Sequence, residues 1–180
     1  MKNFQNHFKI GIVFVGIMLF RLLPFRAPNL EPMMASIMPM GRKYGGVFAF
    51  LFAVSGMVLY DLLTNYGSWT WVTAVTYGVV ALVTPVYFKK YEATPANFAV
   101  FSFFATIFFD LVTGVLVAPF LGQSMMTALA LQIPFTALHL AGNIGFALTL
   151  SPLINKWLLS PKLFTLQKEV IQDASVVVSA

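Results

Sequence analysis

Four polar side chains recur on one face of a long apolar segment in the last third of the sequence. Their spacing of four, three and four residues places them on one stripe of an α-helix: Gln132, Thr136, His139 and Asn143. Asp110 lies in the apolar segment before it. A charged residue at the centre of a bilayer costs on the order of 2.5–3.5 kcal/mol on insertion scales, so such groups face protein or a water-filled cavity. The stripe therefore predicts a surface inside the membrane that binds a polar ligand or acts as a relay.

The composition is that of an integral membrane protein. Of the 180 residues, 59% are hydrophobic and 9% are charged, whereas soluble domains carry about a quarter charged residues. The net charge of +5 does not indicate nucleic-acid binding, because the basic residues flank apolar segments, where they orient membrane spans. The absence of cysteine excludes disulfides and thiolate chemistry. The length predicts one transmembrane helical domain over residues 1–160 and a flexible cytoplasmic tail over 161–180.

Apolar segments predict an all-α fold. The five long segments cover residues 8–23, 45–60, 69–88, 96–120 and 125–158. The apolar run 33–40 is too short to cross a bilayer, and we expect it to form a half-buried helix packed against protein. Pro134 and Pro152 are expected to kink or end the last helix. These segments predict a six-helix bundle with a short second helix and a structured first outer loop.

Basic residues orient the predicted spans. With six crossings and both termini cytoplasmic, nine lysines and arginines lie inside and two outside, and a five-crossing arrangement has the same balance. The positive-inside rule therefore does not distinguish five membrane crossings from six. Both arrangements place the turns at 61–68 and 121–124 outside and Lys89 and Lys90 inside. We expect a multi-pass protein of the cell membrane with both termini in the cytoplasm.

Helical rise predicts where the polar groups lie in depth. At about 1.5 Å per residue, Asp110 and Gln132 are expected at similar depths, in one outward-facing cavity. Aromatic residues, including Tyr60 and Trp71, are expected at its mouth, as in many ligand pockets. Each group has a structural alternative: the aromatic residues can form an interfacial belt. His139 can bond a backbone carbonyl, or can pair with Asp110 only to tie two helices together.

Small residues spaced by four predict a close helix contact. Gly45, Ala49 and Ala53 form such a ladder, which serves either a partner helix or packing within the chain. The sequence contains no catalytic fingerprint of a metalloprotease, a serine hydrolase, a P-loop enzyme or a dinucleotide-binding enzyme. An intramembrane enzyme with His139 and Asp110 as an acid–base pair would lack a nucleophile or metal. We therefore predict a protein that is not an enzyme and that has no cofactor and no metal site.

Three stretches carry a resemblance to a known family: RLLPFRAPNLEP at 21–32, FDLVTG at 109–114 and QIPFTALHLAGN at 132–143. Together with its size and its six predicted helices, the chain resembles the S components of energy-coupling factor (ECF) transporters. These membrane subunits bind vitamins and related micronutrients in prokaryotes. The resemblance covers nearly the whole chain.

The resemblance implies the substrate-binding subunit of an ATP-driven importer. Such a subunit captures a vitamin-like or nucleobase-like solute from outside and delivers it through a membrane coupling protein (the T component) and two ATPases. Carried over, the gating loop would contain Arg26, Asn29 and Glu31, and the pocket would contain Trp71, Asp110 and Gln132.

The surface that would dock the coupling protein departs from the family pattern. Members typically have an A-x-x-x-A pattern in the first helix, where this chain has only Gly11 and Gly16. The ladder from Gly45 to Ala53 is the other candidate for docking. The alternative function is a small multi-span structural protein that docks a partner complex, with the polar stripe as interhelical hydrogen bonding.

Overall fold

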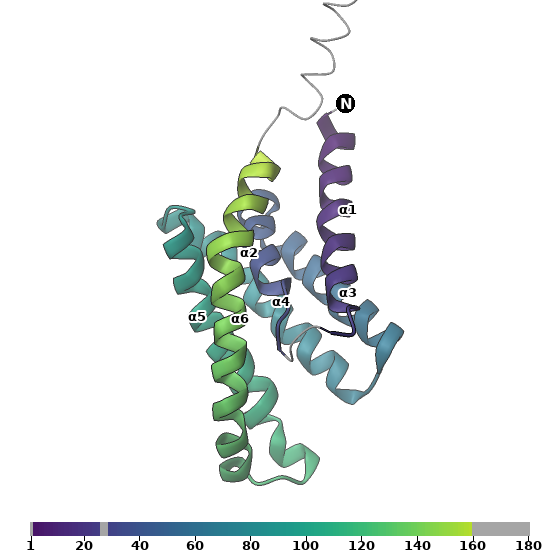
Figure 1. Cartoon of the computed structure of the whole chain (residues 1–180), viewed down its shortest axis with the longest axis vertical. Coiled ribbons are helices and arrows are strands. Elements are labelled where there is room, and N and C mark those ends of the chain that lie inside the picture. The colour runs from purple at the N-terminus through teal and green to yellow at the C-terminus, as the bar shows by residue number, and fades with distance from the viewer. Residues whose placement is uncertain (1, 26–28, 160–180) are drawn as a thin grey trace, which may run out of the picture.

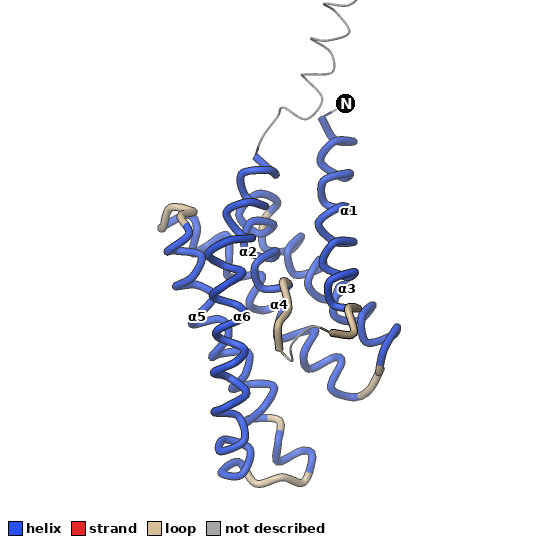
Figure 2. Tube along the Cα trace, viewed as in Figure 1, coloured by secondary structure: helices blue, strands red, loops and turns tan. Residues whose placement is uncertain are grey.

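The computed structural model describes residues 2–25 and 29–159, which form helices joined by short turns (Figure 1). In chain order the α-helices are α1 (Lys2–Arg21), α2 (Met33–Tyr44), α3 (Gly46–Thr64), α4 (Ser68–Lys90), α5 (Pro95–Asp110) and α6 (Met125–Leu159). Between α5 and α6 lie a π-helix, η1 (Leu111–Leu116), and a 3-10 helix, η2 (Ala118–Leu121). Figure 2 shows no strand in this described part of the chain. The predicted all-α fold with a short second helix is confirmed.

Four of the described helical segments are long and apolar enough to cross a membrane. They are α3, α4, α6 and the continuous segment Pro95–Leu121 that joins α5 to η1 and η2. Polar residues in the first turns of α1 lower its hydropathy. The 12 residues of α2 extend about 18 Å, well short of the roughly 30 Å hydrocarbon core. These spans support a membrane protein.

The short helix α2 forms the centre of the bundle, where α3, α4 and α6 pack against it. Every residue from Met33 to Gly41 is buried, so the helix is more deeply enclosed than the half-buried position expected from its sequence. Four of its methionines are fully buried: Met33, Met34, Met38 and Met40. Flexible thioether side chains fill irregular spaces between helices well. This composition suits a helix that is surrounded by protein on all sides.

The ladder of small residues brings helices of this chain together. Ala49 and Ala53 are fully buried, and a Cβ added at Gly41 of α2 would lie 3.3 Å from the Ala49 Cβ. A Cβ added at Gly46 would lie 2.8 Å from the backbone oxygen of Leu82 in α4. Gly45 itself joins α2 to α3 with a φ of 91°, a left-handed conformation that favours glycine. The ladder therefore serves packing within the chain and leaves no face at Ala49 and Ala53 for a partner.

Basic residues tie the start of α1 and the end of α2 to the end of α6. Lys9 Nζ donates to the Trp157 carbonyl at 2.8 Å, and Lys43 Nζ donates to the Leu158 carbonyl. Arg42 Nη1 donates to Asn155 Oδ1 at 2.9 Å. The lysines thus satisfy carbonyls that the last turn of a helix leaves unpaired. We call this the basic end of the bundle; both the start of α1 and the end of α6 lie there, as a six-crossing arrangement requires (Figure 1).

Prolines do not end the last helix. Pro134 and Pro152 both lie inside α6, which continues for 35 residues to Leu159. Of the two outcomes expected at Pro134 and Pro152, a kink or a helix end, the helix end is ruled out. In membrane helices, neighbouring helices and local adjustments can satisfy the backbone groups that a proline frees. One long helix therefore carries the whole polar stripe from Gln132 to Asn143.

Candidate functional site

A buried hydrogen-bonded pair joins α5 to α6. His139 Nδ1 lies 2.7 Å from Asp110 Oδ1, and the two residues are 3% and 1% exposed. Because a carboxylate accepts, the imidazole Nδ1–H is the donor when Asp110 is ionised. The pairing that the sequence offered as an alternative is present in the structure.

A second pair lies one turn away, four residues before Asp110 on α5 and four residues after His139 on α6. Asn143 Nδ2 donates to Thr106 Oγ1 at 2.9 Å, and both residues are fully buried. Thr106 and Ser102 precede Asp110 by four and eight residues, so α5 carries its own polar stripe, facing that of α6. The sequence analysis missed Thr106, although its spacing from Asp110 on an apolar helix could have revealed it.

Each of these pairs contains an acceptor oxygen without a partner. Asp110 Oδ2 and Asn143 Oδ1 are buried and accept no hydrogen bond from the described residues. A buried acceptor left unsatisfied costs about 1–3 kcal/mol, and more when it is charged. A ligand that donates N–H or O–H groups would remove this cost. The site is therefore suited to binding a donor-rich molecule.

The first loop is held to the bundle by the half-buried carboxylate of Glu31. Glu31 Oε2 lies 3.2 Å from Arg21 Nε at the end of α1, and Glu31 Oε1 accepts a hydrogen bond from the Tyr77 hydroxyl of α4. The Arg21 guanidinium also lies 4.0 Å from the centroid of the Tyr60 ring of α3. Glu31 thus connects the loop to α1 and α4, and through Arg21 to α3. The sequence analysis placed Glu31 and Tyr60 at the site but missed Tyr77.

The same loop lies directly on α6. A Cβ added at Gly142 would lie 2.9 Å from Leu30 Cδ1 and 3.4 Å from the Asn29 carbonyl oxygen. Asn29 has a φ of 63°, a left-handed conformation that asparagine tolerates better than most residues. Since Gly142 precedes Asn143, the loop lies next to the second polar pair. Arg26 lies outside the described residues, as does the tail 161–180.

Aromatic rings connect the loop contacts to the α5–α6 pairs. The Tyr77 and Phe109 ring centroids are 4.3 Å apart, and Phe109 lies 5.8 Å from the His139 ring. We call the connected set the polar core: Arg21, Glu31, Tyr77, Thr106, Asp110, His139 and Asn143. It combines a few fixed polar groups with aromatic rings, as small-molecule sites commonly do.

Trp71 is not part of the polar core. It is 52% exposed, and its Nε1 donates to the Tyr66 hydroxyl at 2.9 Å. Trp71 precedes Tyr77 by six residues, so the two side chains point about 120° apart around α4, and Trp71 faces away from Phe109 of α5. Its position agrees with the interfacial aromatic belt that the sequence also allowed. On α4, the aromatic residue that reaches the polar core is Tyr77, which is fully buried against Phe109.

Gln132 and Thr136 lie beside the polar core. Gln132 Nε2 lies 3.3 Å from Thr136 Oγ1, and both residues line a largely apolar groove of about 360 Å³ with Asp110. A Cβ added at Gly114 of η1 would lie 1.9 Å from Gln132 Oε1, so the amide occupies space that only glycine leaves free. Asp110 bonds His139, two turns from Gln132. Asp110 and Gln132, which were expected at similar depths, line this one groove, and the chain beyond Asp110 forms a π-helix.

The described residues contain no group of three histidine, cysteine, aspartate or glutamate side chains that could hold a metal ion. What the polar core can do is bind a solute through hydrogen bonds and ring contacts. The fold and this site together define a helical membrane protein with a buried polar site beneath a structured loop.

Comparison with known protein families identifies the family of the chain. Residues 8–155 match the family described as the ECF-type riboflavin transporter, S component, and the chain belongs to this family. No curated protein and no solved structure is significantly similar to it. Membership confirms the resemblance noted from the sequence and makes the chain a membrane transport protein. It does not favour the structural-scaffold alternative, whose small-residue ladder is used for packing inside the chain.

Proposed function

We propose that this chain is the substrate-binding subunit of an ATP-driven ECF-type importer and that its solute is riboflavin or a close flavin relative. It captures the solute from outside and delivers it through a coupling protein and a pair of ATPases. The family description supports the flavin, and the narrower substrate proposal lies within the vitamin-like or nucleobase-like class expected from the sequence.

The observation that carries the proposal is the pair of buried, unpartnered acceptors at Asp110 Oδ2 and Asn143 Oδ1. A flavin offers an imide N–H at one end of its ring system and several hydroxyl groups on its side chain. Those donors could bond the two unpaired acceptors. An unpaired acceptor lowers stability most in a low-dielectric interior, so bonding it would favour solute binding. Tyr77 packs on Phe109, which in turn contacts the His139 ring that pairs with Asp110, and such aromatic surroundings suit a planar aromatic solute.

The family match supports the partners, a membrane coupling protein and an ATPase pair. Of the candidate docking residues, Gly11 on α1 remains open: it is exposed, and no heavy atom lies within 4 Å of a Cβ added there. We assign partner docking to this exposed face of α1, in place of the buried ladder at Ala49 and Ala53.

The test is a titration of the purified protein with riboflavin, followed by quenching of flavin fluorescence, with other vitamins and nucleobases as competitors. We expect saturable binding that Asp110→Ala abolishes and Gln132→Ala weakens, while both variants insert and purify as the wild type does. Thr149→Ala is the matched control, because Thr149 lies on an exposed face of α6. Failure of every solute in the panel to bind, or unchanged affinity in both variants, would contradict the proposal.

A further inference from the structure

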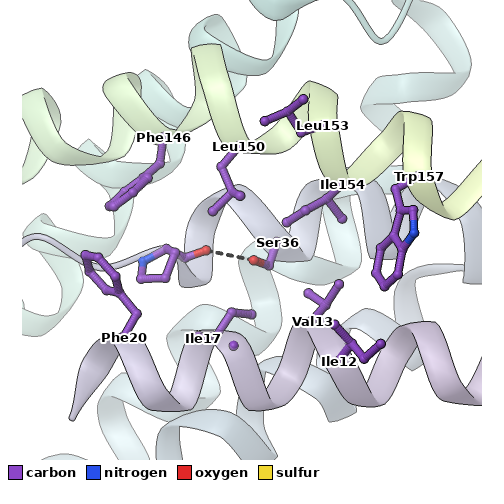
Figure 3. A pocket seen from close by; sticks show the side chains of 12 residues that line it. Ile12, Val13, Ile17, Phe20, Ser36, Phe146, Leu150, Leu153, Ile154 and Trp157 are labelled. Atoms are coloured by element: carbon purple, nitrogen blue, oxygen red, sulfur yellow. Dashed lines mark hydrogen bonds between the residues drawn. The ribbon is translucent and has the colours of Figure 1, made fainter. Parts of the chain in front are cut away.

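A second, apolar groove lies between α1 and α6, on the floor that α2 provides (Figure 3). Its volume is about 510 Å³, and residues such as Ile12, Gly16 and Ile17 of α1 face Leu150, Ile154 and Trp157 of α6 across it. The one hydroxyl on its floor, Ser36 Oγ, is already bonded to the Pro32 carbonyl at 2.9 Å. The groove therefore offers mainly hydrocarbon contacts, because the Ser36 hydroxyl is already paired.

The length of the groove matches one leaflet of a bilayer. Along α6 it runs from Phe146 to Trp157, eleven residues, which corresponds to about 16 Å of helix. The hydrocarbon core of a bilayer is about 30 Å thick, so one leaflet contributes about half of that. Phe20 and Phe146 line the groove at the end away from Trp157. The groove thus has the dimensions of a seat for a single acyl chain.

Positive charge gathers at the Trp157 end of the groove. Lys9 Nζ lies 5.8 Å from the Trp157 ring centroid, and Lys43 Nζ bonds the next carbonyl along α6. Arg42 and Lys156 are exposed nearby at this basic end. Lys9 is buried and Lys43 also donates to Asn6 Oδ1 at 3.1 Å, so the exposed Arg42 and Lys156 are the basic groups that a phosphate can reach. Basic residues near a membrane surface attract anionic lipids.

We propose that this groove binds an anionic phospholipid, with one acyl chain between α1 and α6 and the phosphate at the exposed Arg42 and Lys156 of the basic end. The site is separate from the polar core, and the inference does not depend on the proposed transport function. The lipid would fill the space that separates α1 from α6 and would hold the two helices at their observed spacing.

Quenching of Trp157 by brominated lipids tests the proposal. The chain has three tryptophans, so Trp69→Phe with Trp71→Phe leaves Trp157 as the single fluorophore. The protein is placed in phosphatidylcholine vesicles in which a minor fraction of the lipid is brominated phosphatidylglycerol or, in parallel, brominated phosphatidylcholine. We expect phosphatidylglycerol to be preferred at Trp157 by about fivefold, which corresponds to about 1 kcal/mol.

Two glycines of α1 provide a matched control. No heavy atom lies within 4 Å of a Cβ added at Gly11 or at Gly16, and only Gly16 lines the groove. We expect Gly16→Phe to abolish the preference for phosphatidylglycerol and Gly11→Phe to retain it. Leu153→Phe, at an exposed lining residue, fills the groove from the α6 side if Gly16→Phe does not fold.

Three results would overturn the proposal. One is equal quenching by the two brominated lipids in the unsubstituted groove. Another is a preference that survives the groove-filling variants. The third is protection of Trp157 from both lipids together with cross-linking between copies, which would make the groove a protein interface.

Discussion

Asp110 and Asn143 each use one polar atom in a contact between helices and leave an acceptor oxygen buried and unpartnered. A tie that served only to hold α5 to α6 would satisfy both ends, because an unsatisfied buried acceptor lowers stability. The two unpaired acceptors therefore support the proposed solute site at Asp110 and Asn143. Its neighbours on the stripe, Gln132 and Thr136, bond each other and are half-buried.

Removing the Asn143 acceptor is expected to weaken solute binding more than it weakens the fold. Asn143→Leu keeps similar bulk, and we expect riboflavin affinity to fall about tenfold, equivalent to about 1.4 kcal/mol. Interhelical hydrogen bonds in membranes contribute only about 0.6 kcal/mol on average, so the melting temperature should fall little. Titration and thermal unfolding measure the two effects. Thr149→Val on the exposed face of α6 is the control, and an unchanged affinity in Asn143→Leu would contradict the assignment.

The contact between Glu31 and Tyr77 is expected to contribute measurably to stability. Hydrogen bonds to charged groups contribute about 1.5–3 kcal/mol, and this one joins the first loop to α4. A double-mutant cycle of Tyr77→Phe and Glu31→Gln, read from the free energy of unfolding, should give a coupling energy of at least about 1 kcal/mol. Tyr66→Phe is the control, since Tyr66 and its partner Trp71 are exposed. Purely additive effects of the two substitutions would show that the contact is not formed in solution.

At the scale of elements, the first loop and α6 form one unit at Gly142. The loop touches α6 there, and Glu31 fastens it to α1 and α4. The loop is therefore built into the bundle beside the polar core. Because the loop lies beside Asn143, we expect its packing to affect solute binding.

A larger residue at Gly142 is expected to displace the loop. A Cβ there would already lie 2.9 Å from Leu30 Cδ1, and overpacking costs about 1–3 kcal/mol. We expect Gly142→Val to lower both the melting temperature and riboflavin affinity. Gly145→Val introduces the same side chain into α6 where no heavy atom lies within 4 Å, and should retain wild-type affinity. Equal behaviour of the two variants would mean that the loop contact has no part in binding.

At the scale of the whole molecule, the basic residues concentrate at one end of the bundle. Lys9, Arg42 and Lys43 meet the end of α6 there, and the described residues place Arg21 in the other half, beside the first loop. The positive-inside rule then predicts that the basic end faces the cytoplasm. This orientation would let the polar core receive its solute from outside.

Cysteine labelling tests the orientation directly, because the chain contains no cysteine. Gln123 and Glu92 are exposed in turns at opposite ends of the bundle. We expect a membrane-impermeant maleimide to label Gln123→Cys in intact cells and to label Glu92→Cys only after the membrane is permeabilised. The reverse pattern would invert the predicted topology, and with it the side from which the solute enters.

The helical fold, the short second helix and the polar stripe on α6 could be predicted from the sequence. Hydropathy and helical period are local properties, readable from residues close in the chain. The same period correctly placed His139 and Asn143 on one face of α6. It could not choose between Trp71 and Tyr77, because both are aromatic residues of the apolar helix α4, and only the contacts made in the folded chain distinguish them.

Only the tertiary structure decided which polar groups meet. Arg21, Glu31 and Tyr77 lie on three different segments, and their contacts depend on how the loop folds back onto the bundle. The small-residue ladder at Gly45, Ala49 and Ala53 was compatible with either a partner helix or a helix of the same chain. In the structure, α2 packs against it. The sequence by itself determined which residues must avoid lipid, since that follows from transfer free energy. Their partners depended on packing between distant segments, which no local pattern encodes.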